Sequence, residues 1–306
     1  MPAFFAKNGF WTSPHGRALP CDFAKRTLLM GIVNATPDSF SDGGNFLAPE
    51  ASREQACALV VAGADIIDLG AESTRPGSER ISADEELRRL LPALRAIRDA
   101  LPHIPVSVDT SRPEVAEAAI LAGADIINDV LAIGVSGTVP AASEKYEMGQ
   151  VAARLGAPLI AMHNRPTPDY GDFWTDFLKD LNVGIDRILK SGVPANQLWI
   201  DPGFGFGKTP EQNLQIVARL REIAMLGFPI LLGTSRKSTL GIILGGKLPR
   251  ERTGGDSACC ALGAFHGAAC LRLHDIAAHR DNVITADAIS RTLFLKESLI
   301  SLFLIR

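Results

Sequence analysis

Polar residues stand at the ends of short apolar runs, and they include the residue types best suited to chemistry in this sequence. They are Asn34, Asp68, Asp109, Asn128, His163, Asp201, Ser235 and His274. A carboxylate at a buried strand end must be paired or hydrogen-bonded. Asp109 and Asp201, together with Asn128, could therefore bind a flat bicyclic amide that carries several N–H donors and acceptors. Taken singly, each of these residues could instead cap the helix that follows it.

Cationic residues accompany the later runs. Ser235-Arg236-Lys237-Ser238 follows an apolar run and opens a predicted helix, which suits an anion or a carbonyl-rich ligand. Arg75 follows the second run, and Arg272-x-His274 lies at the last one. Arginine binds phosphate oxygens with two parallel hydrogen bonds. The sequence therefore predicts a diphosphate clamp made of Arg75, Arg272, His274 and Asn34. A surface salt bridge is the alternative for each arginine.

The segment Asp201-Pro-Gly-Phe-Gly-Phe-Gly-Lys208-Thr209 is rich in glycine but does not match a nucleotide-binding loop. A Walker A loop needs glycine at position 202, which is Pro202, and the dinucleotide fingerprint fails because position 208 is lysine. We interpret the glycines as a tight turn that lets Phe204 and Phe206 fold over a site. The alternative for each phenylalanine is hydrophobic anchoring of the turn.

The histidines form no H-x-H or H-E-x-x-H pattern, so no transition-metal site is predicted. Mg²⁺ held mostly by substrate phosphates leaves little trace in a sequence and stays open.

Eight apolar runs alternate with stretches of helical periodicity, and this order predicts the fold. The runs are Thr27–Val33, Asp65–Leu69, Pro105–Val108, Asp125–Ile127, Pro158–Met162, Leu198–Ile200, Pro229–Leu232 and Cys270–Leu273. Without polar alternation they indicate strands buried on both faces, as in a parallel sheet. Ser82-x-x-Glu85, Ser111-x-x-Glu114 and Thr209-Pro210 are predicted helix starts. The sequence Ala62–Asp68 also recurs, nearly unchanged, at 122–128.

Eight strand–helix units in one chain favour a single-domain α/β (β/α)8 TIM barrel over residues 27–306, with residues 1–26 as an N-terminal extension capping it. Asp65 and Asp125 stand at strand starts, so they are assigned to the opposite face from the site. A doubly wound open sheet is the alternative, but the phosphate-binding glycine loop that it usually has after the first strand is missing.

The composition of the chain limits the classes of partner that it can bind. The chain has 306 residues, Lys+Arg 31 and Asp+Glu 34, and a net charge of −3, so no basic field is available for nucleic acid or an anionic membrane. Five cysteines without a C-x-x-C pair indicate reduced thiols. Leu299–Ile305 is too short to span a bilayer and is predicted to end a terminal helix. The first residues do not look like a secretory signal.

Longer motifs resemble the signatures of the dihydropteroate synthase family, from about residue 27 to 292. Met30–Gly44, with the sequence MGIVNATPDSFSDGG, resembles the first signature, and Asp68–Gly77, DLGAESTRPG, resembles the second. The remaining motifs follow in order and are Val108-Asp109-Thr110, Ile127-Asn128-Asp129, Met162-His163, DPGFGF from Asp201, Ser235–Ser238 and Arg272–Asp275.

The resemblance implies a cytoplasmic homodimer that joins p-aminobenzoate to a dihydropterin methyl diphosphate in folate biosynthesis and releases diphosphate. The implied pterin-binding and catalytic residues are Asp109, Asn128, Asp201 and Lys237. The implied diphosphate ligands are Asn34, Arg75, Arg272 and His274, with Asn34 also on Mg²⁺. The implied p-aminobenzoate pocket comprises Thr74, Pro76, Phe206 and Ser238, with Phe40 on the first loop. Met162, Gly233 and Ser235 are further implied substrate-binding residues.

Two other functions remain open. Methyltetrahydrofolate-dependent corrinoid methyltransferases share a pterin-binding barrel, but they need no diphosphate clamp, so the Ser235–Ser238 and Arg272-x-His274 motifs favour the synthase. A non-catalytic or sulfonamide-insensitive variant is the other alternative. The sequence departs from the family at Ala35, at Leu131–Tyr146 and at His163–Pro166, which concerns loop geometry more than chemistry.

Overall fold

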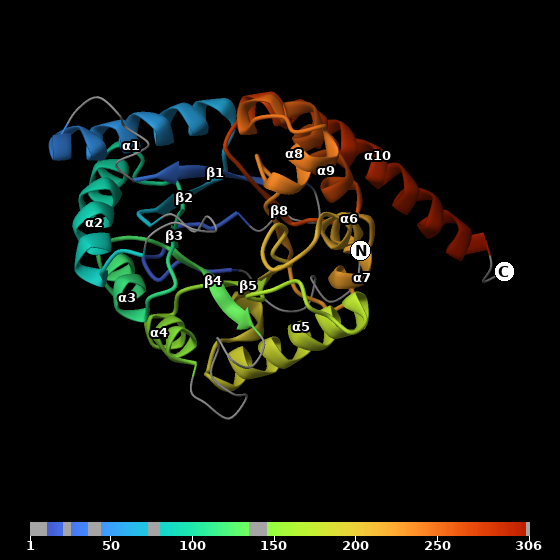
Figure 1. Ribbon diagram of the computed structural model, residues 1–306, viewed down its shortest axis with the longest axis horizontal. Helices are drawn as coiled ribbons and strands as arrows, with labels where there is room; N and C mark the ends of the chain where they lie inside the picture. Colours follow the sequence, from blue (N-terminus) through green and yellow to red (C-terminus); the bar gives the residue numbers. More distant parts are fainter. Residues whose placement is uncertain (1–10, 21–25, 36–43, 73–79, 135–145, 304–306) are drawn as a thin grey trace.

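Eight parallel strands form the wall of a nearly closed barrel, and helices surround it (Figure 1). The computed structural model describes residues 11–20, 26–35, 44–72, 80–134 and 146–303. The strands are β1 Leu28–Asn34, β2 Ile66–Gly70, β3 Val106–Asp109, β4 Ile126–Gly134, β5 Leu159–Asn164, β6 Leu198–Asp201, β7 Leu231–Leu232 and β8 Cys270–Leu273. Each predicted run contains or overlaps one of them. The strand order is β6-β5-β4-β3-β2-β1-β8-β7, and a parallel bridge between Ile200 and Ile230 closes the gap between β6 and β7. The predicted (β/α)8 barrel is confirmed.

The inward-facing residues form an apolar layer below a polar one. One hydrophobic cluster contains Met30, Ile66, Ile126, Ile160, Trp199, Leu231 and Cys270, one from each of seven strands. Because side chains on a strand alternate between its two faces, the residue two positions later points inward too. Those later residues include Asp68, Asn128, Met162, Asp201, Gly233 and Arg272. The barrel is thus filled at its middle, and its polar residues lie toward the carboxyl ends of the strands, where barrel enzymes hold their active sites.

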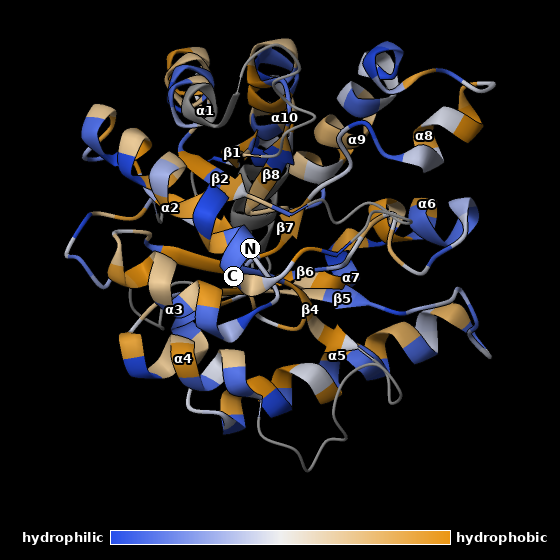
Figure 2. Ribbon diagram, turned by 60° about the vertical axis from the view of Figure 1, so that its left-hand side comes forward, coloured by the Kyte–Doolittle hydropathy of each residue, from blue (hydrophilic) through white to orange (hydrophobic). Residues whose placement is uncertain are grey.

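Helices cover the outer face of the barrel and bury a second, larger apolar cluster against it. Figure 2 shows the strands mostly orange inside a ring of helices with mixed colours. The helices are α1 Gly44–Ala62, α2 Ala83–Ala100, α3 Pro113–Leu121, α4 Glu147–Leu155, α5 Phe173–Lys190, α6 Pro210–Ala218, α7 Leu220–Ala224, α8 Ser238–Ile243, α9 Thr253–Phe265 and α10 Ile276–Phe303. Both faces of each strand are therefore buried, as the unbroken apolar runs predicted.

Two of the three predicted helix starts are confirmed. The Ser82 hydroxyl accepts the Glu85 N–H at the start of α2, and Thr209 forms a full capping box with Gln212 at the start of α6. The prediction for Ser111 is wrong. Helix α3 begins one residue later than that box requires, with Arg112 at the cap position and Pro113 in the first turn. A proline there pre-sets the helical φ angle, so the helix can start without a side-chain cap.

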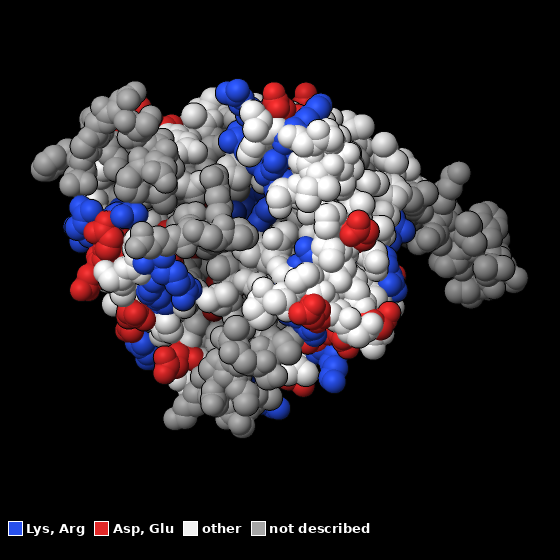
Figure 3. Space-filling model, viewed as in Figure 1, with Lys and Arg blue, Asp and Glu red and all other residues white. Residues whose placement is uncertain are grey.

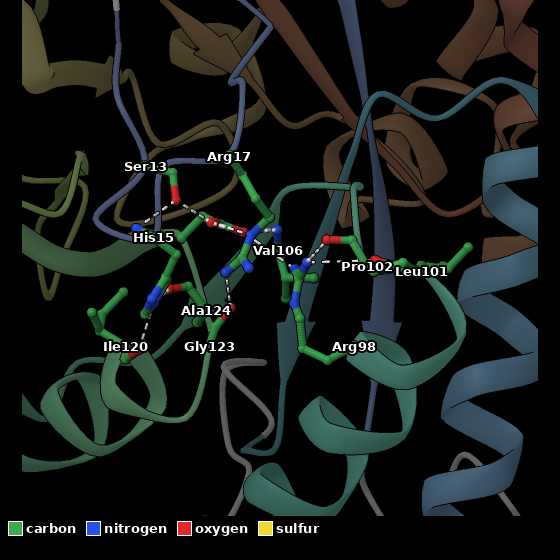
Figure 4. A network of polar contacts seen from close by, with 11 residues as sticks. Ser13, His15, Arg17, Arg98, Leu101, Pro102, Val106, Ile120, Gly123 and Ala124 are labelled. Carbon is green, nitrogen blue, oxygen red and sulfur yellow. Dashed lines mark hydrogen bonds and ion pairs between the residues drawn. The ribbon is translucent and has the colours of Figure 1, made fainter.

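Residues 11–20 lie against the end of the barrel opposite the site. The ring of Trp11 stacks on that of Trp199 with 3.9 Å between centroids. Figure 4 shows a network there, in which the buried carboxylate of Asp125 accepts hydrogen bonds from Arg17 at 2.8 Å and Arg98 at 3.2 Å. Ser13 and the backbone N–H of Val106 also donate to Asp125. Asp125 therefore joins the strand starts to this segment, as its position at a strand start predicted.

The chain ends in a long helix. Helix α10 extends to Phe303 and runs past the barrel wall in Figure 1, so the predicted terminal helix is confirmed. No helix in the described ranges combines the length and apolar composition that crossing a bilayer requires. Cys259, Cys260 and Cys270 are buried free thiols, and Cys57 is partly buried. The four described cysteines thus fit the expected reduced state.

Candidate active site

Arg272 lies at the centre of the polar layer and pairs with two carboxylates. Its Nε donates to Asp68 at 2.6 Å, and its Nη2 donates to Asp109 at 2.8 Å. The amide of Asn128 also donates to the Asp68 carboxylate, at 3.3 Å to Oδ2. Strands β8, β2, β3 and β4 supply these residues, and Asp109 and Asn128 stand side by side in register. The two contacts use two of the five N–H donors of the guanidinium.

Several acceptors in this layer lack a partner among the described residues. Oδ1 of Asp109 and Oδ1 of Asn128 are buried and accept no hydrogen bond, and the Ser107 hydroxyl is unpaired as well. Buried polar atoms are almost always hydrogen-bonded, so unpaired ones call for an explanation. A planar ligand with amino and ring N–H donors would satisfy both Asp109 and Asn128. This pair therefore has the chemistry that a bicyclic amide needs.

A glycine-rich turn after β6 carries the next site residues. Oδ1 of Asp201, the last residue of β6, accepts the Gly203 N–H at 2.7 Å. The Phe206 ring lies under the ammonium of Lys237, with 3.9 Å between Nζ and the ring centroid. A cation over an aromatic face at this distance is attracted by the ring. Phe204 instead is 1% exposed and belongs to the outer core. Phe206 therefore adjoins the site, whereas Phe204 anchors the turn.

The segment before α8 presents Lys237 in a constrained conformation. Arg236 has a φ of 60°, a left-handed geometry that is uncommon for residues other than glycine. Its N–H donates to the buried Asp256 carboxylate of α9, at 3.0 Å and 3.1 Å to the two oxygens. The Arg252 guanidinium donates to the carbonyls of Arg236 and Lys237. Helix α9 thus fixes the backbone that directs Lys237.

Six further predicted residues lie around the same end of the barrel. Ser235 is within 3.1 Å of Nδ1 of His274 and accepts the His274 N–H at 3.3 Å. Asn34 ends β1 and is partly buried, and Met162 is paired in register with Asp201. Ser238 is exposed at the start of α8. Gly233 lies beside Arg272, since a Cβ added to it would be 3.6 Å from the Arg272 Cβ.

Burial sets the protonation of the charged groups. It raises the pKa of the Asp109 carboxyl, against the opposing effect of Arg272, and it raises the pKa of Asp201, against the Gly203 hydrogen bond and Lys237. Burial and the neighbouring Arg272 lower the pKa of Lys237 to about 8, although Asp201 and Asp109 oppose them. Charges of both signs therefore meet in a site where water screens them weakly.

Figure 3 shows Lys and Arg atoms within a hollow near the middle of the face that Figure 1 presents. Four predicted substrate-binding residues lie outside the described residues, namely Phe40, Thr74, Arg75 and Pro76. The expectation that His163 joins the other strand-end residues at this face is wrong. Its neighbour Met162 points inward, so His163 points outward, where it is buried against Phe177 and Asp180 of α5.

Two residues make contacts that the sequence does not predict. Asp68 is fully buried and binds both Arg272 and Asn128. Its position two residues after the inward-facing Ile66 was the signal that could have identified it. The second is Lys208, whose ammonium contacts the glycine-rich turn. Nothing in the sequence indicated that contact.

Metal ligands are sparse. Across the described ranges, no group of three or more His, Cys, Asp and Glu side chains is placed to hold an ion. Asn34 can supply one amide oxygen, a ligand that Mg²⁺ accepts, at the carboxyl end of β1. The donor set thus fits an ion that takes one protein ligand and completes its shell with water and phosphate oxygens.

Comparisons with known proteins agree with this site. Residues 30–274 match the family model described as pterin binding enzyme. A dihydropteroate synthase of Synechocystis is 44% identical over 285 residues, covering 91% of this chain and 95% of that protein. A dihydropteroate synthase of Xanthomonas albilineans solved with 4-aminobenzoic acid has a TM-score of 0.81 at 39% identity, over 91% of this chain and 98% of that one. The same enzyme solved with 7,8-dihydropteroate gives 0.77 at 38% identity, over 90% and 97%.

Proposed function

The chain belongs to the dihydropteroate synthase family, and from that premise we propose how its polar layer performs the reaction. It is a transferase of folate biosynthesis, condensing (7,8-dihydropterin-6-yl)methyl diphosphate with p-aminobenzoate to 7,8-dihydropteroate and diphosphate. The C–O bond to diphosphate breaks, a C–N bond to the arylamine forms, and the arylamine nitrogen releases a proton.

The observation that carries this proposal is the pair of unpaired acceptors beside an ion-paired arginine. Oδ1 of Asp109 and Oδ1 of Asn128 are buried without partners, and Arg272 neutralises the other oxygen of Asp109. Pterin N–H donors would bind the two acceptors. When diphosphate leaves first, the pterin methyl carbon becomes cationic, and the carboxylates of Asp109 and Asp201 stabilise that charge. Because these groups are held in place before the reaction begins, they lower its activation barrier without having to reorganise.

Cations beside the two carboxylates would bind the leaving group. Arg272 retains N–H donors beyond the two that bind Asp68 and Asp109, and Lys237 and His274 lie on the neighbouring segments. Arg272 and His274, with Asn34 and Arg75, would bind the diphosphate oxygens as negative charge develops on the leaving group. Mg²⁺, held by Asn34 and the diphosphate, would neutralise further negative charge on the leaving group when bound.

The arylamine pocket involves the Lys237 and Phe206 pair. Phe206 and the exposed Ser238 would line the p-aminobenzoate site together with Thr74, Pro76 and Phe40. Lys237 would approach the pterin while its stem packs on the Phe206 ring. Since the Yersinia pestis relative is solved with a sulfonamide drug, we expect this pocket to be a sulfonamide target as well.

The test is product formation by the purified chain from the two substrates, with and without Mg²⁺. The proposal expects dihydropteroate and diphosphate in equal amounts, and faster formation with Mg²⁺. A chain that makes no dihydropteroate but demethylates methyltetrahydrofolate with a corrinoid acceptor would be the methyltransferase alternative. Activity unaltered by a chelator would overturn the Mg²⁺ role alone.

A homodimer in the cytoplasm completes the proposal. Leu262 of α9 and Ile284 and Ile289 of α10 are 47%, 51% and 53% exposed, on two helices that pack together through Ser257 and His279. Large apolar side chains on adjacent helices suit a contact between copies of the chain. Sedimentation analysis should give twice the chain mass. A Leu262→Glu/Ile289→Glu variant that stays dimeric would exclude this face.

A further inference from the structure

The ammonium of Lys208 has three acceptors within 3.0 Å and a fourth, the His163 carbonyl oxygen, at 3.5 Å. It donates to the carbonyls of Gly203 and Phe206, each at 2.9 Å, and it lies 3.0 Å from Nδ1 of His163. A protonated lysine has three N–H donors, so the three nearest acceptors match them in number. Two of the acceptors belong to the turn 203–207, which follows Asp201. Lys208 therefore ties this turn to strand β5.

His163 transmits the contact to helix α5, which lies beside β5. Its Nε2 is 3.0 Å from Oδ2 of Asp180, and Nε of Arg165 donates to the same oxygen at 2.8 Å. Burial, and next the charge of Lys208, lower the pKa of His163 to about 3, so the ring is neutral. A neutral ring that accepts from Lys208 at Nδ1 must donate to Asp180 from Nε2. The carboxylate thus fixes the ring in the orientation that binds Lys208.

The other side of the turn faces the site. The Gly203 N–H donates to Asp201, and the Phe206 ring supports Lys237. Gly203 has a φ of +69°, and a Cβ added there would lie 1.8 Å from the His163 carbonyl oxygen. The turn is therefore pressed against β5, and Lys208 bonds the carbonyls of the same two residues that contact Asp201 and Lys237.

We propose that Lys208 is a positioning residue for the transfer reaction. It holds the turn so that Asp201 and Phe206 keep their places, and its positive charge adds to the larger effects of Lys237 and Arg272, which favour the ionised form of Asp201. This inference rests on the proposed function. A lysine that merely stabilised the fold would do the first of these and not the second.

The charges around Lys208 come from every element packed against it. They are Arg165 after β5, Asp180 on α5, Asp201 at the end of β6 and Lys237 before α8, while His163 is neutral. Burial lowers the pKa of Lys208 to about 7, although Asp201 raises it. The same interaction lowers the pKa of Asp201 against the effect of burial. Removal of Lys208 should therefore raise the pKa of Asp201.

The test is the pH profile of kcat/KM for dihydropteroate formation by the full chain. Lys208→Met should lower kcat/KM at pH 7 by about tenfold and move the acid limb of the profile upward. His163→Gln should remain near wild type, because its amide can accept from Lys208 and donate to Asp180. Lys179→Met, on the exposed face of α5, is the matched control.

The outcomes separate the two proposals. If the wild-type chain has no synthase activity, the proposed function is refuted, whereas the contacts that Lys208 makes with the turn are not. An active wild type whose Lys208→Met variant loses rate with an unmoved acid limb, or loses no rate, overturns the role of Lys208. Should Lys208→Met fail to fold, Lys208→Gln, which removes the charge but keeps N–H donors for the turn, must give the same upward move of the acid limb. An unmoved limb in that variant overturns the proposal too.

Discussion

Nη2 of Arg272 donates to Oδ2 of Asp109 across 2.8 Å, although the two residues are 163 positions apart in the sequence. The contact joins the last strand of the barrel to the third, and it links a predicted diphosphate ligand to a predicted pterin ligand. The Asp68 carboxylate accepts a hydrogen bond from the same guanidinium. One arginine therefore neutralises two carboxylates that burial would otherwise disfavour.

Removal of this arginine should destabilise the fold in a pH-dependent way. Arg272→Met leaves Asp68 and Asp109 without their closest cation, so the pKa of Asp109, which burial already raises, should rise further. A carboxyl group whose pKa is higher in the folded than in the unfolded state does not destabilise the fold at low pH, where it is protonated. It destabilises the fold increasingly as the pH rises from the unfolded-state pKa through the folded-state pKa. We expect a loss of roughly 3 to 5 kcal/mol at pH 8 and a clearly smaller loss at pH 6.

Chemical denaturation at the two pH values measures the effect, with Arg250→Met, an exposed arginine after α8, as control. The variant should also bind diphosphate more weakly by calorimetric titration at pH 6, where it is folded. Equal losses of stability at both pH values would contradict the ion-pair account.

Asp109→Asn preserves the shape of the side chain and removes its charge. The amide oxygen can still accept from Arg272, so the fold should be retained, but the developing pterin cation loses its stabilising carboxylate. Turnover should fall at least about tenfold. Asp281→Asn on the exposed face of α10 controls for the substitution itself. Near-normal turnover of Asp109→Asn would remove this residue from the mechanism.

Lys237→Met should also reduce turnover at least about tenfold, because the ammonium over Phe206 is lost while the apolar stem is kept. The wild-type rate should decline as pH rises through about 8, the pKa that burial and Arg272 give this lysine. Steady-state rates from pH 6 to 10 measure both effects, beside the Lys179→Met control. A flat profile above pH 8 would show that the charge of Lys237 is not required.

The ionisation of Asp256 should affect the stability of the fold and not its activity. Burial raises its pKa to about 6, even though it accepts the Arg236 N–H. Its ionisation therefore costs stability as pH rises from about 4, its ordinary value, through about 6. Asp256→Asn cannot ionise, so its stability relative to wild type should improve between pH 4.5 and pH 7. Urea unfolding at both values decides this, and a relative stability that worsens with pH would be the contrary result.

The fold was predictable because the apolar runs carry its signal directly. Each buried strand reads as an unbroken run, and the polar residue at its end marks the barrel face that holds the site. The same reasoning failed for His163, because a shift of one residue moves a side chain to the opposite face. It failed for Ser111, where Pro113 starts the helix by backbone geometry instead of a hydroxyl cap.

The pairing inside the site could not be predicted in the same way. The sequence predicted that Asp109, Asp201 and Arg272 lie at one end of the barrel. It did not predict that Arg272 binds Asp68 and Asp109, because this pairing depends on distances between strands far apart in the chain. The contacts of Lys208 depend likewise on how closely the glycine-rich turn approaches β5.

The most direct test of the central claim is a crystal structure of this chain with 7,8-dihydropteroate. We expect pterin N–H groups within hydrogen-bond distance of Oδ1 of Asp109 and Oδ1 of Asn128, with the benzoate end toward Phe206 and Ser238. A pterin bound elsewhere, with both oxygens still unpaired, would contradict it.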